Sequence, residues 1–228
     1  MATRESDDVR GEEVRAIYDR RFDDGARRSK DAVWKVIVAD FLQRWVRETD
    51  AVLDIGCGFG EFLNHVQCRR RIGVDLNPES KAALAPGIEF LQSDATHLSS
   101  IADQTIDVVF TSNFMEHLPG KAAVEEMIQE VRRVLVPGGS FVALGPNVRV
   151  IPGPYWDFWD HFVPISDRSL TELLETRGFA VTDCYPKFLP YTTRSALPKS
   201  PALVRLYLKV PLVWQLLGSQ FLVRAKKR

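Results

Sequence analysis

The chain contains little that would support disulfide or metal chemistry or secretion. It has 3 cysteines among 228 residues, and Cys57, Cys68 and Cys184 show neither paired spacing nor the spacing of metal ligands. Residues 1–10 are polar and lack the apolar stretch of a signal peptide. We therefore expect no disulfide framework, no metal site and a reducing, cytoplasmic setting.

The chain also lacks net charge, but the two signs are unevenly distributed. Lysine plus arginine number 30, and aspartate plus glutamate number 30. Residues 187–228 hold nine of the basic residues and none of the acidic ones, so the rest of the chain is acidic. The hydrophobic content of 45% is typical of a globular protein, and the length suffices for one α/β domain.

No apolar run is long enough to cross a bilayer. The most apolar segment, residues 202–217, is too short and contains Arg205, Lys209 and Pro211. Because basic residues flank it, one interpretation is peripheral contact with an anionic membrane surface or with a lipid-linked substrate. The other interpretation is a lid or a dimer face that is buried against protein. The sequence leaves both open, and it is compatible with a monomer or a homodimer.

What the sequence does contain is a glycine-rich turn after a short apolar segment. Residues 51–55 form an apolar run typical of a buried parallel strand, and Gly56, Gly58 and Gly60 follow at alternate positions. The pattern of residues 62–66 predicts the start of a helix. Glycine lets the backbone turn sharply and lets a ligand approach closely. The arrangement therefore indicates a site for a nucleotide-like cofactor.

The acidic residues around the turn distinguish between cofactors. A dinucleotide site has the spacing G-x-G-x-x-G, but Glu61 stands here where that pattern requires the third glycine. An acid at the start of a helix competes with a pyrophosphate for the same N–H groups. Asp54 adds a second negative charge at this rim. The carboxylates favour a positively charged cofactor, such as a sulfonium, over a nicotinamide dinucleotide.

The motif D-x-G-x-G-x-G over residues 54–60 resembles motif I of the class I S-adenosylmethionine-dependent methyltransferases. The L-x-P-G-G turn at residues 135–139 is a second mark of that family. The resemblance covers residues 50–146, with a further match at residues 170–179. It implies S-adenosylmethionine as cofactor and S-adenosylhomocysteine as product.

The cofactor-binding residues are expected at the ends of successive strands. Asp75 lies 21 residues after Asp54, where a doubly wound sheet places a carboxylate that accepts two ribose hydroxyls, in an NAD site as well. The resemblance implies that Asp94 and Ala95 contact the adenine and that Asn113 contacts the methionine part. Asp94 could instead cap a helix or turn. The full expected set is Asp54, Gly56, Cys57, Gly58, Asp75, Leu76, Asp94, Ala95 and Asn113.

The order of predicted elements indicates the fold. Apolar runs that alternate with helical patterns predict a single doubly wound, Rossmann-like sheet with helices on both faces. The family resemblance implies that two further strands complete this sheet to seven. The family resemblance implies that the sheet is parallel except for an antiparallel last strand. The expected strands are residues 51–55, 71–75, 88–92, 106–111, 140–144, 180–187 and 219–226.

Two regions are expected outside the regular sheet. Helices in residues 1–48 would precede the methyltransferase domain at residues 49–228. The apolar faces of these helices would pack in the core, or Tyr18 and Phe22 would close over the cofactor. The domain itself would carry an aromatic loop at residues 146–165 and an apolar, basic insertion at residues 188–218. The loop would form a dry acceptor wall or simply anchor itself to the body.

Histidine is the residue type best suited to remove a proton from a hydroxyl acceptor. His117 and His161 are the catalytic candidates, and Asp160, or Asp157, would orient or replace His161. A structural role for each histidine stays open. We expect a small-molecule acceptor, most readily a hydroxyl of a sugar, a lipid or a lipid-linked saccharide, rather than nucleic acid. A nicotinamide-dependent oxidoreductase and a non-catalytic S-adenosylmethionine-binding protein are the alternatives.

Overall fold

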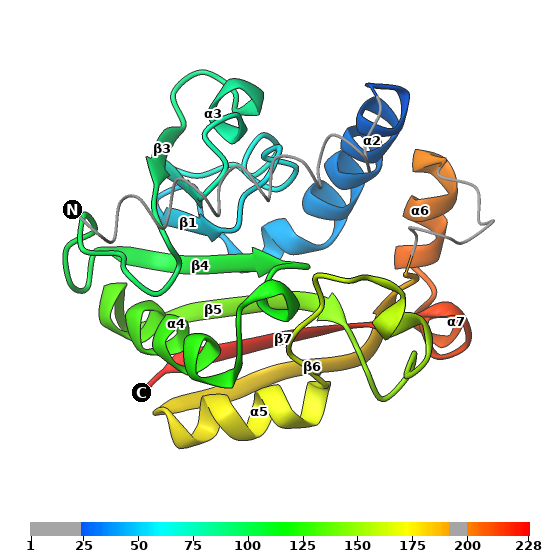
Figure 1. Cartoon of the computed structure of the whole chain (residues 1–228). Coiled ribbons are helices and arrows are strands. Elements are labelled where there is room, and N and C mark those ends of the chain that lie inside the picture. Colours follow the sequence, from blue (N-terminus) through cyan, green and yellow to red (C-terminus); the bar gives the residue numbers. More distant parts are fainter. Residues whose placement is uncertain (1–23, 192–199) are drawn as a thin grey trace. The chain divides into compact units, whose positions relative to one another are not determined.

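The computed structural model describes residues 24–191 and 200–228. Seven strands form a mixed sheet in the order β3-β2-β1-β4-β5-β7-β6 (Figure 1). Strand β7 is antiparallel to both of its neighbours, which confirms the expected sheet with its antiparallel last strand. The strands are β1 (Ala51–Ile55), β2 (Arg70–Asp75), β3 (Glu89–Gln92), β4 (Ile106–Ser112), β5 (Leu135–Pro146), β6 (Phe179–Leu189) and β7 (Gln220–Lys227).

The chain falls into two compact units, each of which is described by itself. The first unit ends at Ala95 and also includes helix α6 (Pro201–Leu208). The second begins at Thr96 and includes helix α7 (Pro211–Leu217) and strand β7. The expected domain boundary after residue 48 stays a prediction. The expected N-terminal helix with Tyr18 and Phe22 lies outside the described residues.

In the first unit, β1, β2 and β3 pair in parallel. All five residues of β1 are buried, as expected for a strand that is covered on both faces. Helix α2 (Asp24–Asp40) contacts α6, and Arg205 Nε lies 2.8 Å from Asp40 Oδ2. The short helices η1 (Leu42–Trp45) and α3 (Ser80–Ala83) complete the unit. The expected apolar face of α2 and η1 is buried at Trp34, Ile37, Val38, Phe41 and Leu42.

The helix expected from residue 62 onward is wrong, because residues 61–65 form turns. Only isolated helical hydrogen bonds are present, such as Asn64 N–H to the Gly60 carbonyl at 2.8 Å. The Asn64 side chain then bonds to the carbonyl of Ala83 and the N–H of Ala85. These side-chain bonds tie the segment to the chain after β2 and favour a turn over a continuing helix.

In the second unit, β4 and β5 pair in parallel, and α4 (Lys121–Val134) connects them. Strand β5 begins earlier than expected, at Leu135, because Leu135 already pairs with Ile106 before the register shifts. Gly138 has φ +76° within the P-G-G turn, a conformation that glycine adopts without strain. One side of α4 is buried, at Val124, Met127, Ile128, Val131 and Val134.

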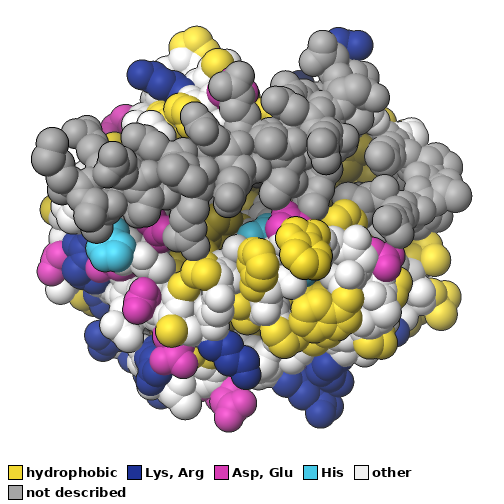
Figure 2. Space-filling model, viewed as in Figure 1, with side chains coloured by type: hydrophobic (Ala, Val, Ile, Leu, Met, Phe, Trp, Pro, Cys, Tyr) yellow, Lys and Arg dark blue, Asp and Glu magenta, His cyan; other side chains and the backbone are white. Residues whose placement is uncertain are grey.

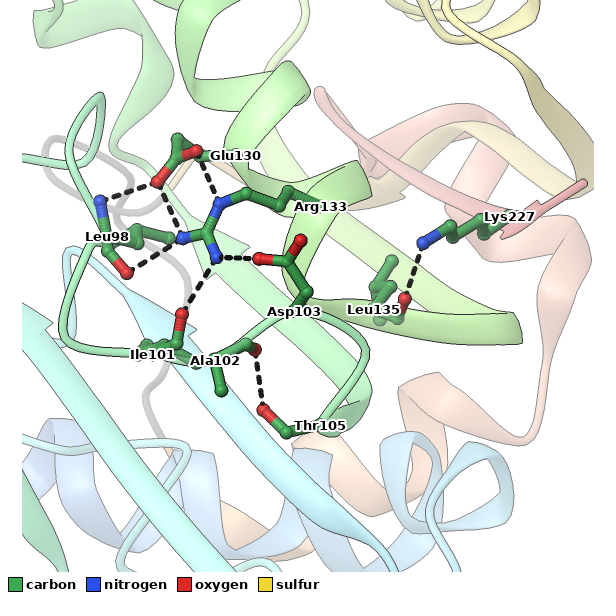
Figure 3. A network of polar contacts seen from close by, with 9 residues as sticks. All are labelled: Leu98, Ile101, Ala102, Asp103, Thr105, Glu130, Arg133, Leu135 and Lys227. Atoms are coloured by element: carbon green, nitrogen blue, oxygen red, sulfur yellow. Dashed lines mark hydrogen bonds and ion pairs between the residues drawn. The ribbon is translucent and has the colours of Figure 1, made fainter.

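Arg133 on α4 holds the loop before β4 in place (Figure 3). Its guanidinium donates to the carbonyls of Leu98 and Ile101, each at 2.8 Å, and to Asp103 Oδ1 at 2.6 Å. Glu130 accepts two further bonds from Arg133 and one from the Leu98 N–H at 2.7 Å. The fork of guanidinium donors thus connects a helix, a loop and a carboxylate at once.

Helix α5 (Asp167–Thr176) is bounded by a capping residue at each end. Ser166 accepts a bond from the Ser169 N–H as the N-cap, and Gly178 after the helix has φ +84°. The helix packs against β6. The buried side chain of Asn147, after β5, donates to Asp167 Oδ1 at 2.7 Å, and Arg149 Nη1 bonds to the same oxygen at 2.7 Å. The loop that follows β5 is therefore attached to the start of α5.

The apolar insertion contains two short helices, α6 and α7. Pro211 is the first residue of α7, a position that proline favours, whereas inside a longer helix it would remove a hydrogen bond. Within residues 24–191 and 200–228, no helix has the length and apolar character needed to cross a membrane.

Candidate active site

The glycine-rich turn after β1 has the backbone that the sequence predicts. Gly56, Gly58 and Gly60 have φ values of +70°, +50° and +75°, in the left-handed region that other residues rarely adopt. A Cβ atom on Gly60 would lie 2.5 Å from Cδ2 of Leu84. The backbone conformation therefore favours glycine at this position, and a Cβ there would also require the Leu84 side chain to move.

Asp75 lies at the end of β2 and is held against the glycine turn. The Gly58 N–H donates to Asp75 Oδ2 at 2.8 Å, and the Asn77 N–H donates to Oδ1 at 2.9 Å. Burial raises the pKa of Asp75, and these two backbone hydrogen bonds oppose that rise. Each carboxylate oxygen can accept a second bond. Asp75 is thus oriented by the chain and retains acceptor capacity for a ligand.

Asp54, Glu61 and Asp75 place three carboxylates near one another in the first unit. Burial raises the pKa of Asp54 well above its usual value, and the charges of Glu61 and Asp75 raise it further. Lys30 Nζ lies 2.6 Å from Glu61 Oε1 and offsets part of this negative charge. A cation at this site would be attracted to the carboxylates, whereas a second anion would be repelled.

The other expected cofactor residues of the first unit line the same strand ends. Cys57 is buried, and burial together with the charge of Asp54 raises the pKa of its thiol, so the thiol stays neutral. Leu76 and Asp94 are half-buried, and Ala95 is buried. Binding of a cofactor by these residues stays a prediction.

Asn113 belongs to the second unit and follows β4. It is exposed and has φ +48°, a conformation that asparagine tolerates better than most residues. Its N–H donates to the carbonyl of Leu144 at 2.9 Å, which connects the ends of β4 and β5. The predicted contact of Asn113 with the cofactor is not tested by this geometry.

His117 and Asp160 form the polar pair of the second unit. His117 ends the short helix η2 (Met115–His117), and its Nδ1 lies 2.8 Å from the carbonyl oxygen of Asp160 and 3.1 Å from Oδ2. A carbonyl oxygen only accepts, so Nδ1 carries a hydrogen and Nε2 is the nitrogen that can receive a proton. The sequence led us to expect Asp160 as the partner of His161. The structure shows Asp160 bound to His117.

His161 lies beside this pair, in the aromatic loop. It is 5% exposed, and its ring stacks on Phe158 with a centroid separation of 5.0 Å. The edges of Tyr155 and His117 approach it, each at a centroid distance of 4.9 Å. The structure therefore brings together all three predicted catalytic residues, which are His117, Asp160 and His161.

Glu116 is a further member of this cluster that the predicted site residues omit. It is 3% exposed, and one ligand atom from each of Glu116, His117 and His161 lies within 4.8 Å of the others. The adjacent residues Glu116 and His117 could be recognised in the sequence as a candidate polar pair, but nothing in the sequence indicated that His161 lies beside them. The Glu116 carbonyl accepts bonds from the N–H groups of Phe162 and Val163, at 2.8 and 3.2 Å.

The electrostatics of the cluster follow from burial and from mutual charge. Burial raises the pKa of Glu116, although the neighbouring His117 opposes the rise. Burial alone lowers the pKa of His117, but the hydrogen bond to Asp160 and the charge of Glu116 outweigh it, so this pKa is raised. A histidine next to two carboxylates holds a proton more firmly than an isolated one.

The aromatic loop contains both buried anchors and exposed rings. Tyr155 lies in the short helix η3 (Pro154–Asp157) and is fully buried, and its hydroxyl donates to the Val163 carbonyl. Trp159, in contrast, is 94% exposed. Hydrophobic side chains gather on the surface over loop 146–165 (Figure 2). Anchoring thus explains Tyr155 but not Trp159, and an acceptor wall stays a prediction.

The comparisons with known proteins agree with these features. Residues 53–143 match the family model described as a methyltransferase domain. A Mycolicibacterium smegmatis protein named "Probable S-adenosylmethionine-dependent methyltransferase" is 36% identical over 141 residues, which cover 58% of this chain and 52% of that protein. The demethylmenaquinone methyltransferase of Symbiobacterium thermophilum is 26% identical over 180 residues, covering 68% of this chain and 70% of that protein.

Solved structures show the same fold. The crystal structure of an S-adenosylmethionine-dependent methyltransferase from Archaeoglobus fulgidus has a TM-score of 0.59 and 24% identity, covering 85% of this chain and 92% of that chain. The chain spans only about half the length of the Mycolicibacterium relative. The family match, the glycine turn and the strand order agree: residues 53–143 match a methyltransferase domain, and the sheet has the fold of the class I S-adenosylmethionine-dependent methyltransferases.

Proposed function

We propose that this protein transfers the methyl group of S-adenosylmethionine to a hydroxyl of a small molecule: a sugar, a lipid or a lipid-linked saccharide. The observation that carries the choice of a hydroxyl is the His117–Asp160 pair, in which Nδ1 lies 2.8 Å from the carbonyl and 3.1 Å from the carboxylate of Asp160. A hydroxyl must lose a proton as it gains a methyl group, and an oriented imidazole can take that proton.

The cofactor would bind in the first unit. Asp75 would accept the ribose hydroxyls with the acceptor capacity that Gly58 and Asn77 leave, and the carboxylate cluster around Asp54 would favour the positive sulfonium. A pyrophosphate would meet the same negative charge unfavourably, which counts against a nicotinamide-dependent oxidoreductase. The family match supports the same choice.

The reaction would be an in-line displacement. Bound S-adenosylmethionine would supply an electrophilic methyl group, which the acceptor oxygen would take while the electron pair of the broken carbon–sulfur bond stays on sulfur. The hydroxyl proton passes to Nε2 of His117. Asp160 would hold the imidazole and stabilise its charged form, whereas His161 would support the His117 ring.

His117 is a better base than His161 for a geometric reason. Its side chain is 29% exposed and can reach a bound acceptor, and its orientation is set by two oxygens of Asp160. His161 is enclosed by Phe158, Tyr155 and His117. A general base needs both access to the acceptor and a defined orientation.

The test combines binding with turnover. We expect the protein to bind S-adenosylmethionine in a calorimetric titration and to label hydroxylated acceptors from a panel of free sugars, polyprenyl-linked sugars and hydroxylated lipids. His117→Ala should leave cofactor affinity nearly unchanged and lower turnover about 100- to 10,000-fold, the usual contribution of a general base. His97→Ala, at an exposed histidine, is the matched control.

Three results would count against the proposal. Methylation of nitrogen or carbon acceptors alone would overturn the choice of a hydroxyl. Full activity of His117→Ala would show that His117 is not the general base. Tight cofactor binding without turnover on any acceptor would favour the alternative of a non-catalytic S-adenosylmethionine-binding protein.

We also propose that the apolar side chains of the insertion contact lipid, either a membrane surface or the lipid part of an acceptor. Leu212 and Leu216 of α7 are 81% and 82% exposed, a large apolar exposure for one short helix. Residues 187–228 carry no acidic side chain that would repel an anionic surface. The double variant Leu212→Ser with Leu216→Ser should then lose co-sedimentation with anionic vesicles. Equal sedimentation of the variant and the wild type would contradict lipid contact through α7.

A further inference from the structure

We propose that Glu116, His117 and His161 form a binding site for a divalent transition-metal ion, and that zinc is the ion that fits best. One ligand atom from each residue lies within 4.8 Å of the other two. All three residues belong to the second unit, so the cluster does not depend on how the two units are placed.

The donor set selects the class of ion. Two imidazoles with one carboxylate are typical ligands of zinc and related transition metals, whereas magnesium and calcium prefer oxygen donors. Zinc binds such nitrogen and oxygen atoms at about 2.0–2.2 Å, which places ligand atoms roughly 3.5 Å apart. Because the three ligand atoms all lie within 4.8 Å of one another, they would have to approach by at most about 1.3 Å to reach that spacing.

Burial makes a cation favourable at this position. Glu116 is 3% exposed, and a buried carboxylate is costly unless a positive charge or hydrogen bonds compensate it. His161 is similarly enclosed, at 5% exposed. A divalent ion would supply the positive charge between these side chains.

The surrounding contacts orient the ligands for this purpose. His117 donates its Nδ1 hydrogen to the carbonyl of Asp160, which is the usual arrangement of a metal-bound histidine that binds through its other nitrogen. The Glu116 carbonyl accepts the N–H groups of Phe162 and Val163, directly after His161. These backbone bonds keep residues 116 and 161 adjacent, so little ordering would be needed when the ion binds.

Three protein ligands leave zinc with an open position, as in catalytic sites of this metal. An acceptor hydroxyl in that position would become more acidic, and because Nε2 of His117 would then bind the ion, the proton would pass to solvent and the ion would replace the imidazole as the activating group of the proposed function. In this one respect the inference rests on the proposed function. The existence of the site itself rests only on the ligand cluster.

The site can be tested without cofactor or acceptor. The metal-free full-length protein is titrated with Zn²⁺ by calorimetry and with Co²⁺ by visible absorption. We expect the wild-type protein to bind one equivalent of zinc and to show a ligand-field absorption band with cobalt. The affinity for zinc should be at least tenfold lower in His161→Ala and in Glu116→Gln. His97→Ala should bind as the wild type does, and excess Mg²⁺ should not displace the zinc.

One measurement needs no variant and so avoids the risk of misfolding. X-ray absorption of the zinc-loaded wild-type protein should show two imidazoles in the first coordination sphere. Absence of stoichiometric zinc binding, equal binding by His161→Ala, or a sphere without two imidazoles would each overturn the site. Failure of the proposed function would look different: zinc would bind, but no hydroxyl acceptor would be methylated with or without it.

Discussion

The N–H of Gly58 donates a 2.8 Å hydrogen bond to the carboxylate of Asp75, and this bond joins the glycine turn to the end of β2. The N–H of Asn77 holds the other carboxylate oxygen at 2.9 Å. Asp75 therefore serves two purposes in the proposed cofactor site. It stabilises the turn, and it would present oxygen atoms to the ribose of a bound cofactor.

Replacing Asp75 should weaken cofactor binding. In Asp75→Ala, the ribose hydroxyls lose charged acceptors worth about 1.5–3 kcal/mol, and the dissociation constant for S-adenosylmethionine should rise roughly 10- to 100-fold. Calorimetric titration measures the change. Glu126→Ala, at an exposed acid on α4, should bind the cofactor as the wild type does. If Asp75→Ala bound S-adenosylmethionine as tightly as the wild type, Asp75 would not be a cofactor-binding residue.

Asp54 should make stability depend on pH in a defined direction. Its pKa is raised in the folded protein, first by burial and then by Glu61 and Asp75, above the unfolded value of about 3.9. The folded state thus binds the proton more tightly, and stability is lost as the pH rises from that unfolded value through the folded one. The side chain introduced by Asp54→Asn does not ionise, so this variant should not lose stability as the pH rises through that range.

The comparison is made without cofactor, by denaturant unfolding at several pH values. Asp54→Asn should be more stable than the wild type at neutral pH, and the gap should shrink as the pH falls toward 4. The same variant should bind S-adenosylmethionine more weakly, because the attraction to the sulfonium is removed. A variant that is less stable at every pH would show that the Asp54 carboxylate is not destabilising in the folded protein.

Asp160→Asn should separate the two contacts of His117. The backbone carbonyl that accepts the Nδ1 hydrogen is retained, whereas the carboxylate 3.1 Å away loses its charge. The charged imidazole in the transition state would lose about 1.5–3 kcal/mol of stabilisation, so turnover should fall roughly 10- to 100-fold. Single-turnover kinetics with saturating cofactor measure this fall. A change in acceptor affinity with turnover intact would assign Asp160 to binding instead.

Arg133→Ala should destabilise the second unit without affecting the chemistry. The substitution leaves the carbonyls of Leu98 and Ile101 and the carboxylate of Glu130 without their shared donor (Figure 3). We expect a loss of about 1–3 kcal/mol in the free energy of unfolding, because the network is partly exposed. Arg132→Ala, at the exposed neighbouring position, is the control. Equal stability of the two variants would show that the network contributes little.

The central strands could be predicted from the sequence because they lie in apolar runs. Strand β1 is buried at all five positions, and β4 and β5 have nearly the same character, so composition alone located them. The ends of α5 were also predictable, since Ser166 and Gly178 are specific capping signals. These signals are local in the chain.

Features that depend on distant residues were not predictable in the same way. The turns after Gly60 replace a helix because Asn64 bonds to Ala83 and Ala85, about 20 residues away. His117 meets Asp160 across 43 residues of chain that include an irregular loop. A sequence pattern could name these side chains as candidates, but it could not say which histidine Asp160 would contact.

The crowding of Asp54, Glu61 and Asp75 has a consequence for how binding would be observed. Burial and mutual repulsion raise the affinity of Asp54 for a proton in the unliganded protein. At a pH below the raised pKa of Asp54, a sulfonium arriving at this cluster would displace the proton that Asp54 holds. The measured heat of binding would then vary with the ionisation enthalpy of the buffer, and the protein would acidify its medium each time it takes up a cofactor molecule.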